Sequence, residues 1–258
     1  VCSLAGIHSI PIAKGMDRPL VRELVTAASI HGSSGLDGPS LPEPTITLAP
    51  MHAVDLLIKL LLASEGDLTI VATGPLTNIA TAIRREPRIV PKIQRIVLMG
   101  GAIGLGNWTP AAEFNIFVDP EAAHIVFSCG RPVTMVGLDV THTVLATARV
   151  RARVRALGTP VAHLVDDLLG FFAETYLRVF GFSAPPLHDP CAVAHVVDST
   201  LMRTQPMSVE IELRGEWTLG RTVCDAHGVT GKPANAQVGV GIDAPRFWDL
   251  LIETLAMY

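Results

Sequence analysis

The chain has 258 residues, of which 49% are hydrophobic and 17% are charged, and its formal net charge is −4. This length and apolar content are enough for one large α/β domain or two small ones. The slightly acidic balance excludes a protein that binds nucleic acid or anionic membrane through general positive charge, and the apolar runs are too short and too often interrupted by charge to span a bilayer.

Short β-branched runs alternate with longer helical patterns through the first 140 residues. In chain order, the pattern predicts a strand end turning into a glycine loop at 28–38, a helix at 51–66, a strand at 67–73, a helix at 75–86, a strand at 93–100, a helix at 120–129 and a strand at 132–140. The strands are almost continuously apolar. The sequence therefore predicts an α/β fold with an open, mostly parallel sheet and helices on both faces.

The pattern changes after residue 148, where helices become longer and strands shorter. Helices are predicted at 148–158, 160–181, 187–199 and 243–258, and short strands at 207–213, 220–226 and 236–242. Asp166 and Asp167, on the long second helix, are expected to face solvent. Because no stretch resembles a flexible linker, we expect one domain with additional helices and short strands.

Four polar segments coincide with predicted strand ends or helix starts, at 72–78, 99–115, 137–143 and 187–191. In open α/β sheets, ligands bind beyond the carboxyl ends of the strands. These segments are therefore the candidates for a binding site. The glycine string at 100–106 does not have the spacing of a dinucleotide fingerprint, which argues against a nicotinamide-dependent oxidoreductase.

Asn107, Glu113 and Asn115 stand among apolar residues in the segment 106–117. A carboxylate flanked by amides suits vicinal hydroxyl groups, because each hydroxyl both donates and accepts a hydrogen bond. Sugar binding is the natural use of such a set. The alternative is that Glu113 caps a helix or forms an ion pair at the surface.

His188 and Asp189 precede Pro190 at the start of a predicted helix. Asp189 in this position could simply cap the helix, with Pro190 as its first residue, or it could bind a metal or a hydroxyl. His188 could act as a general acid near neutral pH. His31 could be a second imidazole of the same site, or a turn residue without a catalytic role.

Taken together, these segments resemble the inosine–uridine-preferring nucleoside hydrolase family. "AEFNIFVDPEAA" at 112–123 and "HDPCAVA" at 188–194 carry most of the resemblance, which extends over essentially the whole chain. The tail at 220–243 is similar to bacterial ribonucleoside hydrolases, including the pyrimidine-preferring branch. The resemblance implies a single Rossmann-like domain over 1–258, which hydrolyses the N-glycosidic bond of a ribonucleoside to ribose and free base.

The resemblance also implies a Ca²⁺ ion that binds the ribose hydroxyls and the attacking water, and a transition state with positive charge on the ribose. It assigns metal ligation to Asp189 and the Thr73 carbonyl, and activation of the leaving base to His188 or His31. The residues that it places against the substrate are Met99, Asn107, Glu113, Phe114, Asn115, Tyr176, Phe180 and Asp189. We expect uridine to be accepted, and the resemblance leaves inosine open.

The family's aspartate cluster, of the type DxDxGxDD, does not occur in these 258 residues. We expect the protein to carry this cluster on a strand–helix–strand segment ahead of Val1. The alternative function is a catalytically silent nucleoside- or ribose-binding protein that lacks the metal cluster. By resemblance we expect a homotetramer, or else a dimer, and the widely spaced Cys2, Cys129, Cys191 and Cys224 favour reduced thiols in the cytoplasm.

Overall fold

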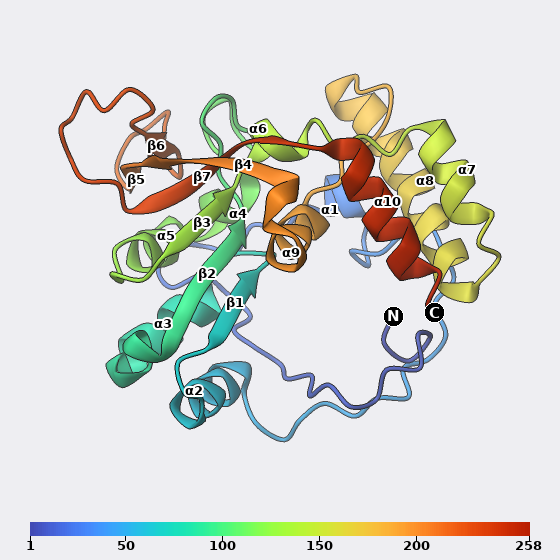
Figure 1. The fold of residues 1–258 in the computed structure, drawn as a ribbon, viewed down its shortest axis with the longest axis horizontal. Coiled ribbons are helices and arrows are strands. Elements are labelled where there is room, and N and C mark those ends of the chain that lie inside the picture. The colour runs from blue at the N-terminus through green and yellow to red at the C-terminus, as the bar shows by residue number, and fades with distance from the viewer.

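The computed structural model describes residues 1–258, and its centre is a five-stranded sheet (Figure 1). The strands lie in the order β1–β2–β3–β7–β4, and all pairs are parallel except β4 with β7. Their bounds are Leu68–Ala72 for β1, Ile93–Met99 for β2, Val133–Val136 for β3, Ala236–Ile242 for β7 and Met202–Met207 for β4. The expected open, mostly parallel sheet is confirmed.

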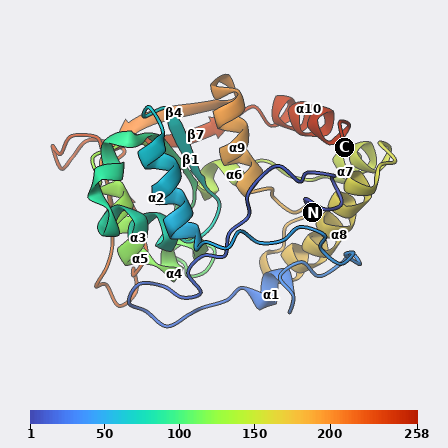
Figure 2. The ribbon, with the colours of Figure 1, turned by 90° about the horizontal axis from the view of Figure 1, so that it is seen from below.

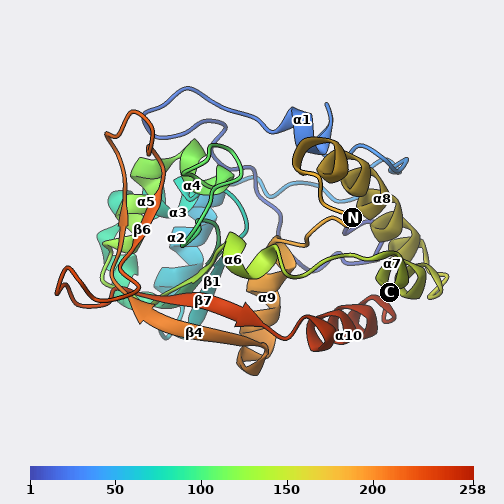
Figure 3. The same ribbon diagram turned by 90° about the horizontal axis from the view of Figure 1, so that it is seen from above.

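Helices cover both faces of this sheet, and one strand shows why. In β2, Ile96 and Leu98 are buried on one side, and Val97 and Met99 are buried on the other. Successive side chains of a strand point to opposite faces, so a strand that is apolar throughout needs a cover on each. The first face packs against α2 (Ala53–Ala63), α3 (Thr77–Arg85) and α5 (Pro120–Phe127), and the second against α6 (Leu138–Thr141) and α9 (Asp189–Val197). The helix α10 (Ala244–Leu255) lies beyond the end of the sheet and adds Phe247 and Trp248 to the core of the second face (Figure 3).

Two further helices, α7 (Ala148–Arg155) and α8 (Pro160–Phe180), stand beside the sheet and pack against each other (Figure 1). The short α1 (Ala28–His31) lies against α8, and long segments without helix or strand lead to it and away from it (Figure 2). The remaining elements are short: η1 (Pro87–Lys92), α4 (Phe114–Val118), η2 (Ser199–Leu201), and the antiparallel pair β5 (Val209–Ile211) and β6 (Thr222–Cys224). No helix combines the length and the apolar character needed to cross a membrane.

Four local predictions were wrong. The single strand expected at 207–213 is divided, since β4 ends at Met207 in the main sheet and β5 belongs to the separate pair with β6. The strand expected at 132–140 ends at Val136, because Gly137 begins the turn into α6. The strand end expected at 28–38 is the helix α1. Asp166 does not face solvent: its side chain is only 3% exposed and pairs with Arg151 and Arg155, both of α7, at 2.8 Å each. An acid that joins two helices in this way must be paired when it is buried.

Candidate active site

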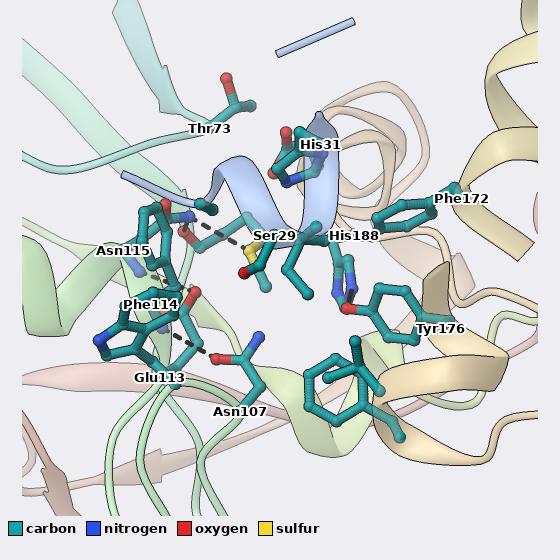
Figure 4. A pocket seen from close by; sticks show the side chains of 17 residues that line it. Ser29, His31, Thr73, Asn107, Glu113, Phe114, Asn115, Phe172, Tyr176 and His188 are labelled. Carbon is teal, nitrogen blue, oxygen red and sulfur yellow. Dashed lines mark hydrogen bonds between the residues drawn. The ribbon is translucent and has the colours of Figure 1, made fainter. Parts of the chain in front are cut away.

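A cavity of about 320 Å³ opens at the carboxyl edge of the sheet, bordered by α1, α8, the start of α9 and the loop at 100–113 (Figure 4). Its volume is at the lower end of the range typical of small-molecule sites. Every site residue expected from the sequence lines it: His31, Thr73, Met99, Asn107, Glu113, Phe114, Asn115, Tyr176, Phe180, His188 and Asp189. Segments that are separated by more than 150 residues therefore meet at one place.

Glu113 is buried and holds the loop at 100–113 in place. One carboxylate oxygen accepts from the backbone N–H of Asn115 at 2.9 Å, and the other accepts from Gly101 at 2.9 Å and from Ile116 at 3.1 Å. Glu113 thus caps α4, as the alternative interpretation allowed, but in the interior and not at the surface. Desolvation raises the pKa of Glu113 to about 7, against the effect of the three N–H donors, which lower it.

Asn107 and Asn115 are oriented by the backbone of the same loop. The Asn107 side-chain oxygen accepts from the Phe114 N–H at 3.0 Å, and the Asn115 amide nitrogen donates to the Met99 carbonyl at 3.1 Å. These contacts decide which way each amide faces. Asn107 therefore turns its NH₂ group towards the cavity, where Tyr176 is its neighbour, and Asn115 keeps its oxygen for a ligand (Figure 4).

Asp189 faces the cavity and has no hydrogen bond or ion pair of its own within the chain. It does not cap α9, as the alternative interpretation proposed, because it is already the first helical residue and His188 occupies the N-cap position. Although its side chain is open to the cavity, the protein around it removes water and raises the pKa of Asp189 to about 6. A carboxylate without a partner beside a cavity marks a functional site more often than a structural one.

His188 is fixed at both ring nitrogens. Its Nε2 is 2.7 Å from the Tyr176 hydroxyl, and its Nδ1 is 2.8 Å from the Thr141 hydroxyl. Desolvation, with smaller contributions from the neighbouring His142 and His31, lowers the pKa of His188 to about 3, so this imidazole is neutral near pH 7. Desolvation also raises the pKa of Tyr176 above its usual value.

Aromatic side chains form the wall of the cavity along α8. Phe172, Tyr176 and Phe180 follow one another at intervals of four residues, and their ring centroids are 4.5 and 4.9 Å apart. His31 stacks on Phe172 with a centroid distance of 5.4 Å, and desolvation lowers the pKa of His31. The cavity therefore has polar groups at Asn107, Glu113 and Asn115 on one side, with Phe114 among them, and the aromatic rings of α8 on the other (Figure 4).

Residues 1–249 match the model of the family described as inosine-uridine preferring nucleoside hydrolase. The chain belongs to this family. Two relatives are named pyrimidine-specific ribonucleoside hydrolase RihA. The one from Citrobacter koseri is 50% identical over 99% of this chain and 82% of its own length, and the one from Escherichia coli is 50% identical over 96% and 80%.

Solved structures of nucleoside hydrolases have the same fold. A purine-preferring ribonucleoside hydrolase from Gardnerella vaginalis superposes with a TM-score of 0.91 and 35% identity, over 99% of this chain and 84% of its own. The plant nucleoside hydrolase PpNRh1 gives a TM-score of 0.90 and 32% identity, over 99% and 83%. The expectations of family and of fold class are thereby confirmed.

Six further residues of this nucleoside hydrolase line the cavity, although the sequence did not predict them as site residues. They are Ala27, Ser29, Ile30, Trp108, Phe172 and Val179. Phe172 could have been found, since it precedes Tyr176 and Phe180 at the same helical spacing and so shares their face. Nothing in the local pattern distinguishes Ala27, Ser29 or Ile30.

Proposed function

We propose that this protein hydrolyses the N-glycosidic bond of ribonucleosides, giving ribose and free base. The observation that supports it best is the lining of the cavity, in which Asn107, Glu113 and Asn115 gather on one side and the aromatic rings of α8 stand on the other (Figure 4). A ribonucleoside has the same division into a polyhydroxylated sugar and a flat base. Family membership supports the reaction type.

In this proposal the polar end binds the ribose. The NH₂ of Asn107 donates to a hydroxyl, and the oxygens of Asn115 and Glu113 accept from hydroxyls. Glycosidic cleavage passes through a state with positive charge on the sugar ring. The Asp189 carboxylate faces the cavity and contributes negative charge that stabilises this state.

The leaving base lies against the aromatic end. His31, Tyr176 and His188 are the groups there that can hydrogen-bond a base nitrogen or oxygen as the bond breaks. His31 forms no side-chain hydrogen bond and stacks only on Phe172, whereas both ring nitrogens of His188 are occupied. His31 and the Tyr176 hydroxyl are therefore the groups that reach the base directly.

We propose Ca²⁺ as the metal ion. Asp189 and the Thr73 carbonyl are oxygen donors of the kind that a hard cation takes, but Ca²⁺ takes about six to eight oxygens. No group of three or more His, Cys, Asp or Glu in residues 1–258 forms a metal-binding cluster. This set is too small to hold the ion by itself, and water, substrate hydroxyls or residues outside 1–258 would have to complete it.

Release of ribose from uridine, cytidine and inosine, measured with and without a strong chelator, tests the proposal. We expect uridine and cytidine to be cleaved faster than inosine, because two relatives at 50% identity are named pyrimidine-specific. We expect the chelator to abolish release and added Ca²⁺ to restore it. Nucleoside binding without ribose release, in the presence of Ca²⁺, would contradict hydrolysis and favour the silent binding protein.

By the same resemblance we propose a cytoplasmic homotetramer, with a dimer as the alternative. All four cysteines are free, which suits a reducing compartment. Light scattering on the eluted protein distinguishes the two assemblies.

A further inference from the structure

Thr141 lies at the end of α6, completely buried, on the side of His188 that faces away from the cavity wall of α8. Its hydroxyl is 2.8 Å from His188 Nδ1, and this is the only hydrogen bond that the hydroxyl forms. The opposite nitrogen, Nε2, is 2.7 Å from the hydroxyl of Tyr176. The imidazole is thus held between two hydroxyl groups that belong to different helices.

The positions of the protons follow from these partners. The imidazole contacts two hydroxyls and no carboxylate, and its neutral form can use both contacts, with one ring nitrogen donating a proton and the other accepting one. If Nδ1 carried it, the hydroxyl proton of the buried Thr141 would have no acceptor, which is unfavourable for a group without access to water. If Nε2 carries it, Thr141 donates to Nδ1 and the Nε2–H donates to the Tyr176 oxygen, so each of these protons has an acceptor.

The tautomer with the proton on Nε2 of His188 affects the Tyr176 hydroxyl, which lines the cavity. Because the Tyr176 oxygen accepts from His188, the Tyr176 proton must point elsewhere, and this side chain, although only 3% exposed, lines the cavity close to Asn107. If Nδ1 of His188 carried the proton instead, the Tyr176 hydroxyl would donate its proton to Nε2 and would not offer it to a ligand. The tautomer of His188 therefore decides whether Tyr176 offers a donor to the cavity.

We infer that Thr141 is a positioning residue, which selects the Nε2–H tautomer of His188 and so turns the Tyr176 hydroxyl into a hydrogen-bond donor towards the leaving base. Thr141 donates a hydrogen bond and transfers no proton. Its effect on the reaction rests on the proposed hydrolysis, whereas its effect on the tautomer does not.

Magic-angle-spinning NMR of protein labelled with ¹⁵N-histidine tests the tautomer without substrate. The His188 signals are those that disappear in His188→Gln. In the native protein and in Thr141→Ser, we expect Nε2 to have the shift of a protonated nitrogen and Nδ1 that of an unprotonated one. Thr141→Val, which has the same shape but no hydroxyl, is expected to lose this pattern. A protonated Nδ1 in the native protein, or an unchanged tautomer in Thr141→Val, would overturn the inference.

Kinetics supply the second readout. Thr141→Val is expected to lower kcat about 10-fold, the equivalent of one hydrogen bond, with little change in KM, and Thr141→Ser is expected to recover most of the loss. Thr143→Val is the control, since this neighbouring hydroxyl donates only to the Val140 carbonyl and does not line the cavity. Equal loss in the Ser and Val variants would assign Thr141 a packing role and contradict positioning. If the native protein cleaves no nucleoside, the proposed function fails and the NMR result still decides the tautomer.

Discussion

Replacing Asp189 by Asn is expected to lower kcat/KM by about 10³-fold while leaving the protein at least as stable as the native form. The loss follows from removing the carboxylate that faces the sugar in the cavity. The variant is expected to remain stable because the Asp189 side chain forms no hydrogen bond or ion pair with the rest of the chain. Initial rates with uridine and thermal unfolding in a chelating buffer measure the two effects.

The sign of the stability effect comes from the raised pKa of Asp189. The folded-state pKa, about 6, is above the unfolded value of 3.8, so folding disfavours the ionised carboxylate. This unfavourable contribution appears as the pH rises above 3.8 and is complete above about 6, and at pH 7 the Asn variant is free of it. Asp167→Asn is the matched control, since Asp167 is exposed on α8 and does not line the cavity. If Asp189→Asn instead unfolds at a lower temperature, with activity lost in proportion, Asp189 is a structural residue.

Glu113→Gln is expected to affect both folding and activity. The carboxylate accepts three backbone N–H bonds, and an amide has one oxygen, so one buried N–H would face the new NH₂ group. One unsatisfied buried donor costs about 1–3 kcal/mol of unfolding free energy. Because the loop that carries Asn107 and the start of α4 would shift, we expect kcat/KM to fall by about 10²-fold, mainly through a higher KM.

Chemical denaturation and uridine kinetics measure the two effects of Glu113→Gln. Glu253→Gln is a suitable control, because Glu253 is exposed near the end of α10 and takes no part in the cavity. Retention of native stability by Glu113→Gln would mean that the loop does not depend on its carboxylate. Normal stability together with normal KM would remove Glu113 from the ribose site.

The sheet and the location of the site could be predicted because both depend on local pattern. Apolar runs such as 93–99 are strands in any context that buries both faces, and the carboxyl ends of parallel strands meet at one edge. The site residues followed from that edge rule together with the family resemblance. They line a single cavity, and their individual roles remain predictions.

The wrong predictions concern residues whose burial or conformation depends on contacts with other parts of the folded chain. Asp166 is buried because Arg151 and Arg155 reach it from another helix, and no pattern within α8 contains that information. Residues 138–141 include β-branched side chains that suit a strand, but β3 ends at Val136 and the chain turns into α6. The orientations of the Asn107 and Asn115 amides were equally out of reach, since backbone atoms of a folded loop fix them.

The most direct test of the account is the fate of uridine in water enriched in ¹⁸O, with the protein supplied with Ca²⁺. We expect equal amounts of uracil and ribose, one ¹⁸O atom at C1 of the ribose, and no dependence on inorganic phosphate. Intact uridine after prolonged incubation, or release of uracil only when phosphate is present, would contradict hydrolysis in this cavity.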